Sequence, residues 1–214
     1  MKSFSAPNLL AKIIVSGLIV LSMGTSCRPK AVNVKTGIFE GSTDIGGPTI
    51  KGNAFYEASS QTYLLEGGGE NIWGENDQLH YVWKKAKGDF ILQAQVKFVG
   101  EGVNAHRKIG IMLRNDLTEG SAHVNGVVHG DGLTSLQFRP VKNGQTQEIK
   151  TEVVMADVIQ LERTGNRYIL SAAAYGDEFA RVELPQLELN EELYAGIFIC
   201  AHEDTVLEKA TFTN

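Results

Sequence analysis

The chain has 214 residues, with 25 acidic side chains, 20 basic side chains and two cysteines, a length that suits one domain or two small ones. Hydrophobic residues make up 43% of it, which is enough for a packed core and excludes a wholly disordered chain. Charged residues, at 21%, are too few for a coiled coil, and no segment is basic enough to indicate a nucleic-acid binder. The 23 glycines and only five prolines predict many tight turns between short strands.

The first 26 residues have the pattern of a secretory signal peptide. Lys2 and Lys12 precede the apolar run Ile13–Met23, which is shorter than the ~20 residues that span a bilayer. The small residues Gly24–Ser26 then lead to Cys27, an ending that resembles the lipobox of bacterial lipoproteins, with Gly24 at the place of the usual leucine. We expect cleavage before Cys27 and lipidation of its sulfur, with ordinary secretion as the alternative.

Cleavage there would leave an acidic protein that only a lipid could hold at a membrane. It removes two lysines and no acid, so the net charge goes from −5 to −7, and such a chain is not drawn to anionic lipid or nucleic acid. The sequence therefore predicts a bacterial envelope protein anchored by acyl chains on Cys27. Arg28, in place of aspartate, favours the outer membrane. We expect residues 27–35 to be a lipidated tether and residues 36–214 to be one domain, in which the unpaired Cys200 is buried.

After the tether, short apolar runs alternate with turn residues and predict an all-β domain. The expected strands are Gln78–Lys85, Phe90–Val99, Lys108–Arg114, Ala122–Val128, Thr134–Val141, Gln147–Val154, Val158–Arg163, Arg167–Tyr175, Ala180–Leu184, Leu193–Ala201 and Ala210–Thr213. Thr164–Asn166 is a hairpin signal, and Glu191–Leu193 could form one short helical turn. No fixed repeat is visible, so roughly a dozen antiparallel strands in a jelly-roll sandwich are favoured over a propeller.

Alternation with a period of two predicts which side chains leave the core. The apolar members of three strands are expected to face inward: Leu79, Tyr81, Trp83, Ile109, Ile111, Leu113, Leu136 and Phe138. This leaves His80, Arg114, Gln137 and Arg139 on the outer face of a sheet. Such a set could serve a ligand, or could be an ordinary polar face with cross-strand pairs.

Several motifs follow one another in the order of a known class of domain. They are Asp44-Ile45-Gly46, Gly67–Gly74 (GGGENIWG), Asp77, Gly88-Asp89-Phe90 and Gly110–Arg114 (GIMLR). Together they resemble the concanavalin A-like lectin and glucanase sandwich domains of secreted bacterial proteins, over about residues 43–214. That superfamily includes lectins, carbohydrate-binding modules and glycoside hydrolases, so the resemblance implies the fold and leaves the function open.

The carboxylates do not predict a familiar catalytic pair. A glycosidase needs two carboxyl groups about 5–9 Å apart, and endoglucanases of this fold carry Glu-x-Asp-x-x-Glu on one strand. The nearest run here, Glu203–Glu208, has the wrong spacing. Gly67–Gly69 lacks the lysine and Ser/Thr of a phosphate loop, so we expect it to supply positive φ angles instead. We therefore expect no catalytic residue.

Histidines and aspartates are the candidate metal ligands of this sequence. The five histidines lack the spacing of a helical zinc motif. His123 and His129 would share one face of a strand, unless Asn125-Gly126 forms a turn. Asp44, Asp77 and Asp131 lie in glycine-rich segments and are candidate ligands of a structural Ca²⁺. The alternative is that each aspartate stabilises its own turn. No other cofactor is expected.

The remaining residues favour sugar binding. Trp73 would be the stacking platform, while His80, Arg114, Gln137 and Arg139 would supply hydrogen bonds, for which the planar guanidinium is well suited. The sequence therefore predicts an envelope lipoprotein with a non-catalytic glycan-binding domain. Two alternatives stay open: a glycoside hydrolase with an unfamiliar catalytic pair, and a structural module that binds an envelope protein.

Overall fold

A computed structural model of the chain describes residues 36–213. The predicted signal peptide, Cys27 with its predicted lipidation, and the predicted tether lie outside these residues. Within them, no helix is long and apolar enough to cross a membrane.

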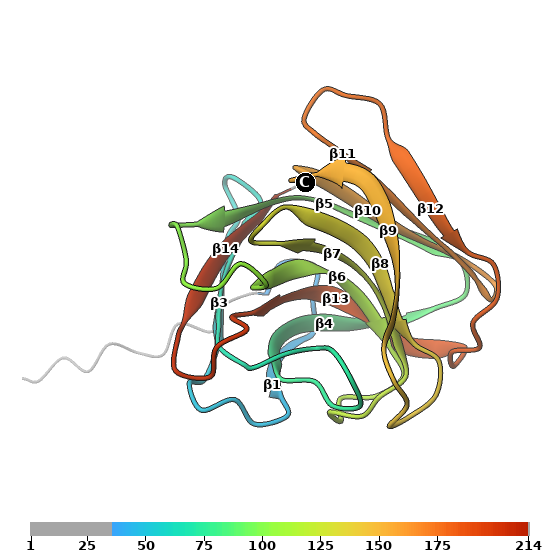
Figure 1. Cartoon of the computed structure of the whole chain (residues 1–214), viewed down its shortest axis with the longest axis horizontal. Helices are drawn as coiled ribbons and strands as arrows, with labels where there is room; N and C mark the ends of the chain where they lie inside the picture. The colour runs from blue at the N-terminus through green and yellow to red at the C-terminus, as the bar shows by residue number, and fades with distance from the viewer. Residues whose placement is uncertain (1–35, 214) are drawn as a thin grey trace, which may run out of the picture. The chain divides into compact units, whose positions relative to one another are not determined.

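Residues 36–213 form fourteen strands in two seven-stranded antiparallel sheets, and none of them lies in a helix (Figure 1). Sheet A has the spatial order β1 (Gly41–Ile45), β4 (Leu79–Lys87), β13 (Glu192–Cys200), β6 (Lys108–Arg114), β7 (His123–His129), β8 (Leu133–Arg139) and β9 (Gln147–Val154). Sheet B has the order β12 (Ala180–Leu184), β11 (Arg167–Ala173), β10 (Val158–Thr164), β5 (Phe90–Val99), β14 (Glu208–Thr213), β3 (Thr62–Gly67) and β2 (Asn53–Glu57). The predicted jelly-roll sandwich is confirmed.

The predicted strands from β4 to β14 are confirmed, with ends that differ by one or two residues. The hairpin is also confirmed: Thr164 pairs with Arg167, so Gly165 and Asn166 form a two-residue loop. Gly165 has φ of 58°, which suits the first position of such a turn because glycine has no Cβ to clash there.

The helical turn considered at Glu191–Leu193 is wrong. Glu192 already begins β13 and pairs with Lys87 of β4. Its carboxylate also accepts a hydrogen bond from Lys85 at 2.9 Å. Cross-strand pairing therefore decides the conformation of a segment whose local sequence also suits a helical turn.

The main core lies between the two sheets. Ile109, Ile111 and Leu113 of β6 point into it, as predicted, and meet residues of sheet B such as Leu161 and Leu170. The sheets approach closely at Gly126, where an added Cβ would lie 2.6 Å from a methyl carbon of Leu170. That approach explains a glycine in the middle of a strand.

A second apolar cluster covers the opposite face of sheet A. The segment Gly68–Gln78, which we call the covering segment, connects β3 to β4 (Figure 1, teal). Its Ile72 is fully buried and belongs to one cluster with Met112, Val127 and Phe198. The outer face of this sheet is therefore covered by the chain itself.

The covering segment overturns one prediction about β4. Leu79 and Tyr81 belong to the cluster beneath it, whereas His80 shares the inter-sheet side of the strand with Val82. His80 fits there because Gly52 and Gly67 leave room: an added Cβ would lie 2.3 and 2.8 Å from its atoms. Both faces of β4 are buried, so an alternating pattern cannot tell which face meets the other sheet.

Candidate functional site

The candidate site is the outer face of sheet A together with the covering segment. Strand register puts Arg114, His123 and Arg139 in one row across β6, β7 and β8, and Asn125 opposite Gln137 in another. The structure thus brings three of the five predicted ligand-binding residues to one face: Arg114, Gln137 and Arg139.

The two arginines are engaged within the protein. Arg139 makes a two-pronged contact with Asp77, with Nη2–Oδ1 of 2.7 Å and Nη1–Oδ2 of 3.0 Å. Arg114 Nη2 lies 3.3 Å from the same carboxylate. All three side chains are fully buried. Asp77 therefore neutralises one guanidinium and shares its charge with a second, which is why both can lie under the loops.

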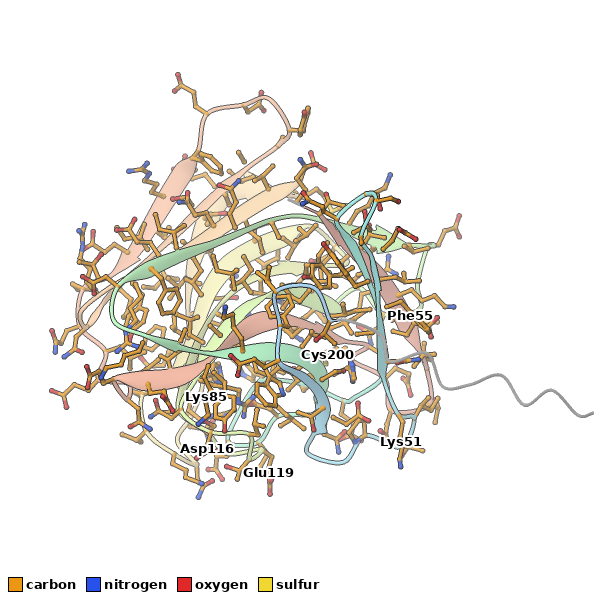
Figure 2. The ribbon with its side chains drawn as sticks, turned by 180° about the vertical axis from the view of Figure 1, so that it is seen from behind. Lys51, Phe55, Lys85, Asp116, Glu119 and Cys200 are labelled. Carbon is orange, nitrogen blue, oxygen red and sulfur yellow. The ribbon has the colours of Figure 1, made fainter. Side chains whose placement is uncertain are left out.

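Loop carbonyls accept several of the other hydrogen bonds of these guanidiniums. Arg114 donates to the carbonyls of Asp116 and Thr118, and Arg139 donates to those of Gly74 and Glu119. Figure 2 labels Asp116 and Glu119 near each other in the loop that follows β6. The arginines thus tie this loop and the covering segment to the sheet, and the expectation that Arg114 is free for a ligand is not supported.

The three aspartates predicted to hold Ca²⁺ lie apart. Asp44 contacts His80 Nδ1 at 2.8 Å and accepts from the Gly52 amide at 3.0 Å, while Asp77 is held by the arginines. Asp131 accepts from the Leu133 amide at 3.1 Å, the local turn contact weighed as the alternative. Within residues 36–213, no group of three acidic, histidine or cysteine side chains is placed to hold a metal ion.

His80 does not reach the candidate site. Its ring lies between Asp44 and the hydroxyl of Ser42, which is 2.8 Å from Nε2. The side chain is buried on the inter-sheet side of β4. Its place is therefore at the edge of the main core, away from the other four predicted residues.

Trp73 lies on the covering segment and is 46% exposed. It lines an open groove of about 510 Å³ whose other lining residues are all polar: Glu70, Asn71, Glu75, Asn76, Gln78 and Gln145. The segment is fixed beside it, because the Gly74 carbonyl accepts from Arg139 at 3.0 Å and from the Thr146 amide at 3.1 Å. The tryptophan is thus held on a polar surface by a buried network.

A set of buried polar residues beneath the segment was not predicted. Asn125, His123 and His129 share the outer face of β7, which runs unbroken through the Asn125-Gly126 pair where a turn was considered. All three are buried. Alternation would have placed them beside Arg114 and Gln137, but it gives no sign that a distant segment covers that face.

Burial keeps two of these histidines neutral. It lowers the pKa of His123 and of His129 to about 4, and the nearby cations Arg139 and Lys108 act in the same direction. Burial likewise raises the pKa of the Cys200 thiol to about 11. Cys200, labelled in Figure 2, is fully buried as predicted and is not suited to be a nucleophile.

The histidine shift predicts acid sensitivity above the range where carboxylates titrate. The unfolded chain takes up a proton on His123 near pH 6.5 and the folded chain only near pH 4, so between these values the unfolded state binds more protons and stability falls as pH falls. By pH 5 the loss from this group is about 2 kcal/mol. Urea unfolding at pH 7 and pH 5 should show it, and His123→Gln should reduce it. His106→Gln, which changes an exposed ring, is the control, and equal wild-type stability at both pH values would contradict the prediction.

Comparison with known proteins identifies the fold class. No family model matches the chain, and no curated protein matches it. Among solved structures, a functionally unknown protein from Saccharomyces cerevisiae superposes with a TM-score of 0.59 and 18% identity, over 81% of this chain and 93% of that one. The carbohydrate-binding module CBM66 from Bacillus subtilis superposes with a TM-score of 0.53 and 12% identity, over 83% and 94%. The domain is therefore a concanavalin A-like β-sandwich, as the motifs implied.

Proposed function

We propose that this protein is a non-catalytic glycan-binding module whose ligand lies in the Trp73 groove. The observation that carries the proposal is the half-exposed indole of Trp73 in a groove otherwise lined by amides and carboxylates. Tryptophan is highly buried on average, so a half-exposed indole that lines a polar groove is a candidate contact for a ligand.

The lining suits the chemistry of a sugar ring. One face of a pyranose carries C–H groups that can lie on an indole, while its edge carries hydroxyls that both donate and accept. The amide of Asn76 offers a donor and an acceptor side by side. Asn71 offers its amide nitrogen, because its oxygen accepts from Lys108, and Gln145 offers its amide oxygen, because its nitrogen donates to Glu75. The carboxylates of Glu70 and Glu75 accept. The concanavalin A-like fold supports the proposal, since one structural neighbour is a carbohydrate-binding module, although that likeness shows the fold alone.

Affinity electrophoresis of the full-length protein in detergent, with neutral and acidic polysaccharides in the gel, tests this function. We expect retardation by at least one polysaccharide without release of reducing sugar. Release of reducing ends would favour the glycoside hydrolase, for which Glu70 and Glu75 are the carboxylates in the groove. No retardation by any glycan would remove the proposal and favour a module that binds an envelope protein.

We also propose that the protein is localised to the cell envelope, which the lipobox-like ending at Cys27 supports. Cys27→Ser removes the thiol to which the lipid would be attached, so the variant should move into the soluble fraction or keep its signal peptide uncut. Fractionation and the mass of the processed chain measure both results. A variant that is processed and stays with the outer membrane, like the wild type, would contradict the anchor.

A further inference from the structure

Buried polar atoms without partners concentrate under the covering segment. Within residues 36–213, seven buried side-chain nitrogen or oxygen atoms have no hydrogen-bond partner, and five of them belong to His123, Asn125, His129 and Gln137. These residues are neighbours on β7 and β8 and point to the outer face of sheet A. Buried polar groups in native proteins are nearly always satisfied, so such a cluster indicates that something polar belongs there.

Two of the contacts define which atoms donate. The Gln137 amide nitrogen, Nε2, lies 3.0 Å from Glu148 Oε1 and donates to this carboxylate. The amide oxygen of Gln137 therefore points away and has no partner. The same amide nitrogen lies 3.2 Å from His129 Nε2, which must accept a hydrogen bond from it. A neutral His129 then carries its proton on Nδ1, a buried donor without a partner. Asn125 adds one donor and one acceptor.

A buried cation adjoins these atoms. Lys108 of β6 pairs with His129 of β7 and is only 2% exposed. Its ammonium donates to Asn71 Oδ1 at 3.0 Å and to the His106 carbonyl at 2.9 Å, and it lies 3.1 Å from His202 Nδ1. All three partners are neutral acceptors. A buried ammonium is normally paired with a carboxylate.

The acids of the region do not supply that partner. Among the described residues, no carboxylate lies within 4.0 Å of the Lys108 ammonium, since no ion pair includes it. Instead, Glu148 Oε2 lies 3.7 Å from Lys150 Nζ, and Asp131 Oδ2 lies 3.8 Å from His106 Nδ1. The positive charge of Lys108 thus has no counter-charge in contact.

We infer that Lys108, Asn125, His129 and Gln137, which we call the inner patch, bind the carboxylate-bearing ring of an acidic sugar. The carboxylate would accept from Lys108 and from His129 Nδ1, while ring hydroxyls exchange hydrogen bonds with Asn125 and the Gln137 oxygen. This assignment rests on the proposed function, because it deepens the ligand class from glycans to uronic-acid glycans.

The covering segment connects the inner patch to the groove. Asn71 lines the groove and also accepts from Lys108, so in the free protein its side-chain oxygen stands where an oxygen of the carboxylate would bind. Access requires the stretch from Asn71 to Trp73 to lift, which takes Ile72 out of its cluster with Met112 and Phe198 while the Gly74 carbonyl keeps its contact with Arg139. Gly69 and Gly74, with φ of 105° and 82°, flank that stretch and give it backbone freedom that other residues lack.

Titration calorimetry on the full-length protein in detergent tests the assignment with matched probes. These are galacturonate against galactose, glucuronate against glucose, and polygalacturonate against its methyl ester, and the members of each pair differ only at C6, where a carboxylate takes the place of a neutral group. We expect at least one acid to bind tenfold or more tightly than its neutral partner. Lys108→Met should abolish that preference, and Asn125→Leu should weaken both members of the pair.

The ligand-free stability of the variants separates this site from a merely structural role. Asn125→Leu removes two unsatisfied polar atoms, so its melting temperature should equal or exceed that of the wild type. Gln160→Met, which changes an amide on sheet B, is the control and should leave the acid preference unchanged. A lower melting temperature of Asn125→Leu with unchanged affinities would mean that buried water satisfies the patch, and would overturn the inference.

The outcomes also distinguish this inference from the proposed function. Equal binding of acid and neutral probes, or an acid preference that survives in Lys108→Met, removes the inner patch and leaves the Trp73 groove. Binding of no sugar at all removes both. The comparison of wild-type acid and neutral affinities needs no variant, so the inference can be refuted even if Lys108→Met does not fold.

Discussion

Replacing Asp77 with alanine is expected to lower the free energy of unfolding by about 3–5 kcal/mol, the range for breaking a buried ion pair by removing one partner. The carboxylate is the buried acid between Arg114 and Arg139, at 3.3 Å and 2.7 Å from their Nη2 atoms. Without it, two buried guanidiniums are left with neutral partners only, such as loop carbonyls and the Thr146 hydroxyl. Chemical unfolding of the wild type and the variant measures the difference.

Asp116→Ala provides the matched control for that substitution. Asp116 pairs with Lys142 at 3.1 Å and accepts from the Thr118 amide at 2.8 Å, but the Asp116 and Lys142 side chains are both partly exposed. An exposed ion pair contributes about 1 kcal/mol or less, so the loss should be smaller than that of Asp77→Ala. If Asp77→Ala cost no more than this control, the buried network would not stabilise the fold.

The same measurement on Arg114→Ala should show a clear loss of stability, in contrast to the small change expected for an arginine that only binds a ligand.

Most of the strands could be predicted because their apolar runs are separated by turn residues. In β6 and β8 the inward direction was also correct, since the branched residues Ile109, Ile111 and Leu113 share one face of β6, and Leu136 and Phe138 share one face of β8. The strands β1, β2 and β3 were not expected. The first two have only five residues each, and one of them, GSTDI, has mostly small or polar side chains, so its pairing with β4 rather than its composition makes it a strand.

The site was harder to predict because outward-facing was equated with exposed. The alternation in β6 correctly directs Arg114 away from the other sheet, but the loop after β6 and the covering segment bury it. The covering segment has no periodic pattern. Its one buried apolar residue, Ile72, belongs to a cluster with residues of sheet A, and only tertiary contact shows that the outer face has a second core.

The covering segment carries Trp73, so the groove exists only because this segment lies on the sheet. Trp73→Ala should weaken glycan binding at least about tenfold, or about 1.4 kcal/mol, because a tryptophan at the centre of a contact typically carries much of the binding energy. The indole is 46% exposed, and the segment is fixed through Ile72 and Gly74, so the melting temperature should change little. Affinity electrophoresis and thermal unfolding measure the two quantities.

The matched control is Tyr175→Ala, which removes an aromatic ring that is 74% exposed and lies outside the groove. It should leave glycan binding intact. This result would show that the weaker binding of Trp73→Ala does not come from the loss of just any exposed ring. Equal binding by the wild type and Trp73→Ala would refute the groove as the site. A variant that lost affinity and melting temperature together would instead assign Trp73 to holding the covering segment, whose displacement would also uncover Lys108 and the inner patch.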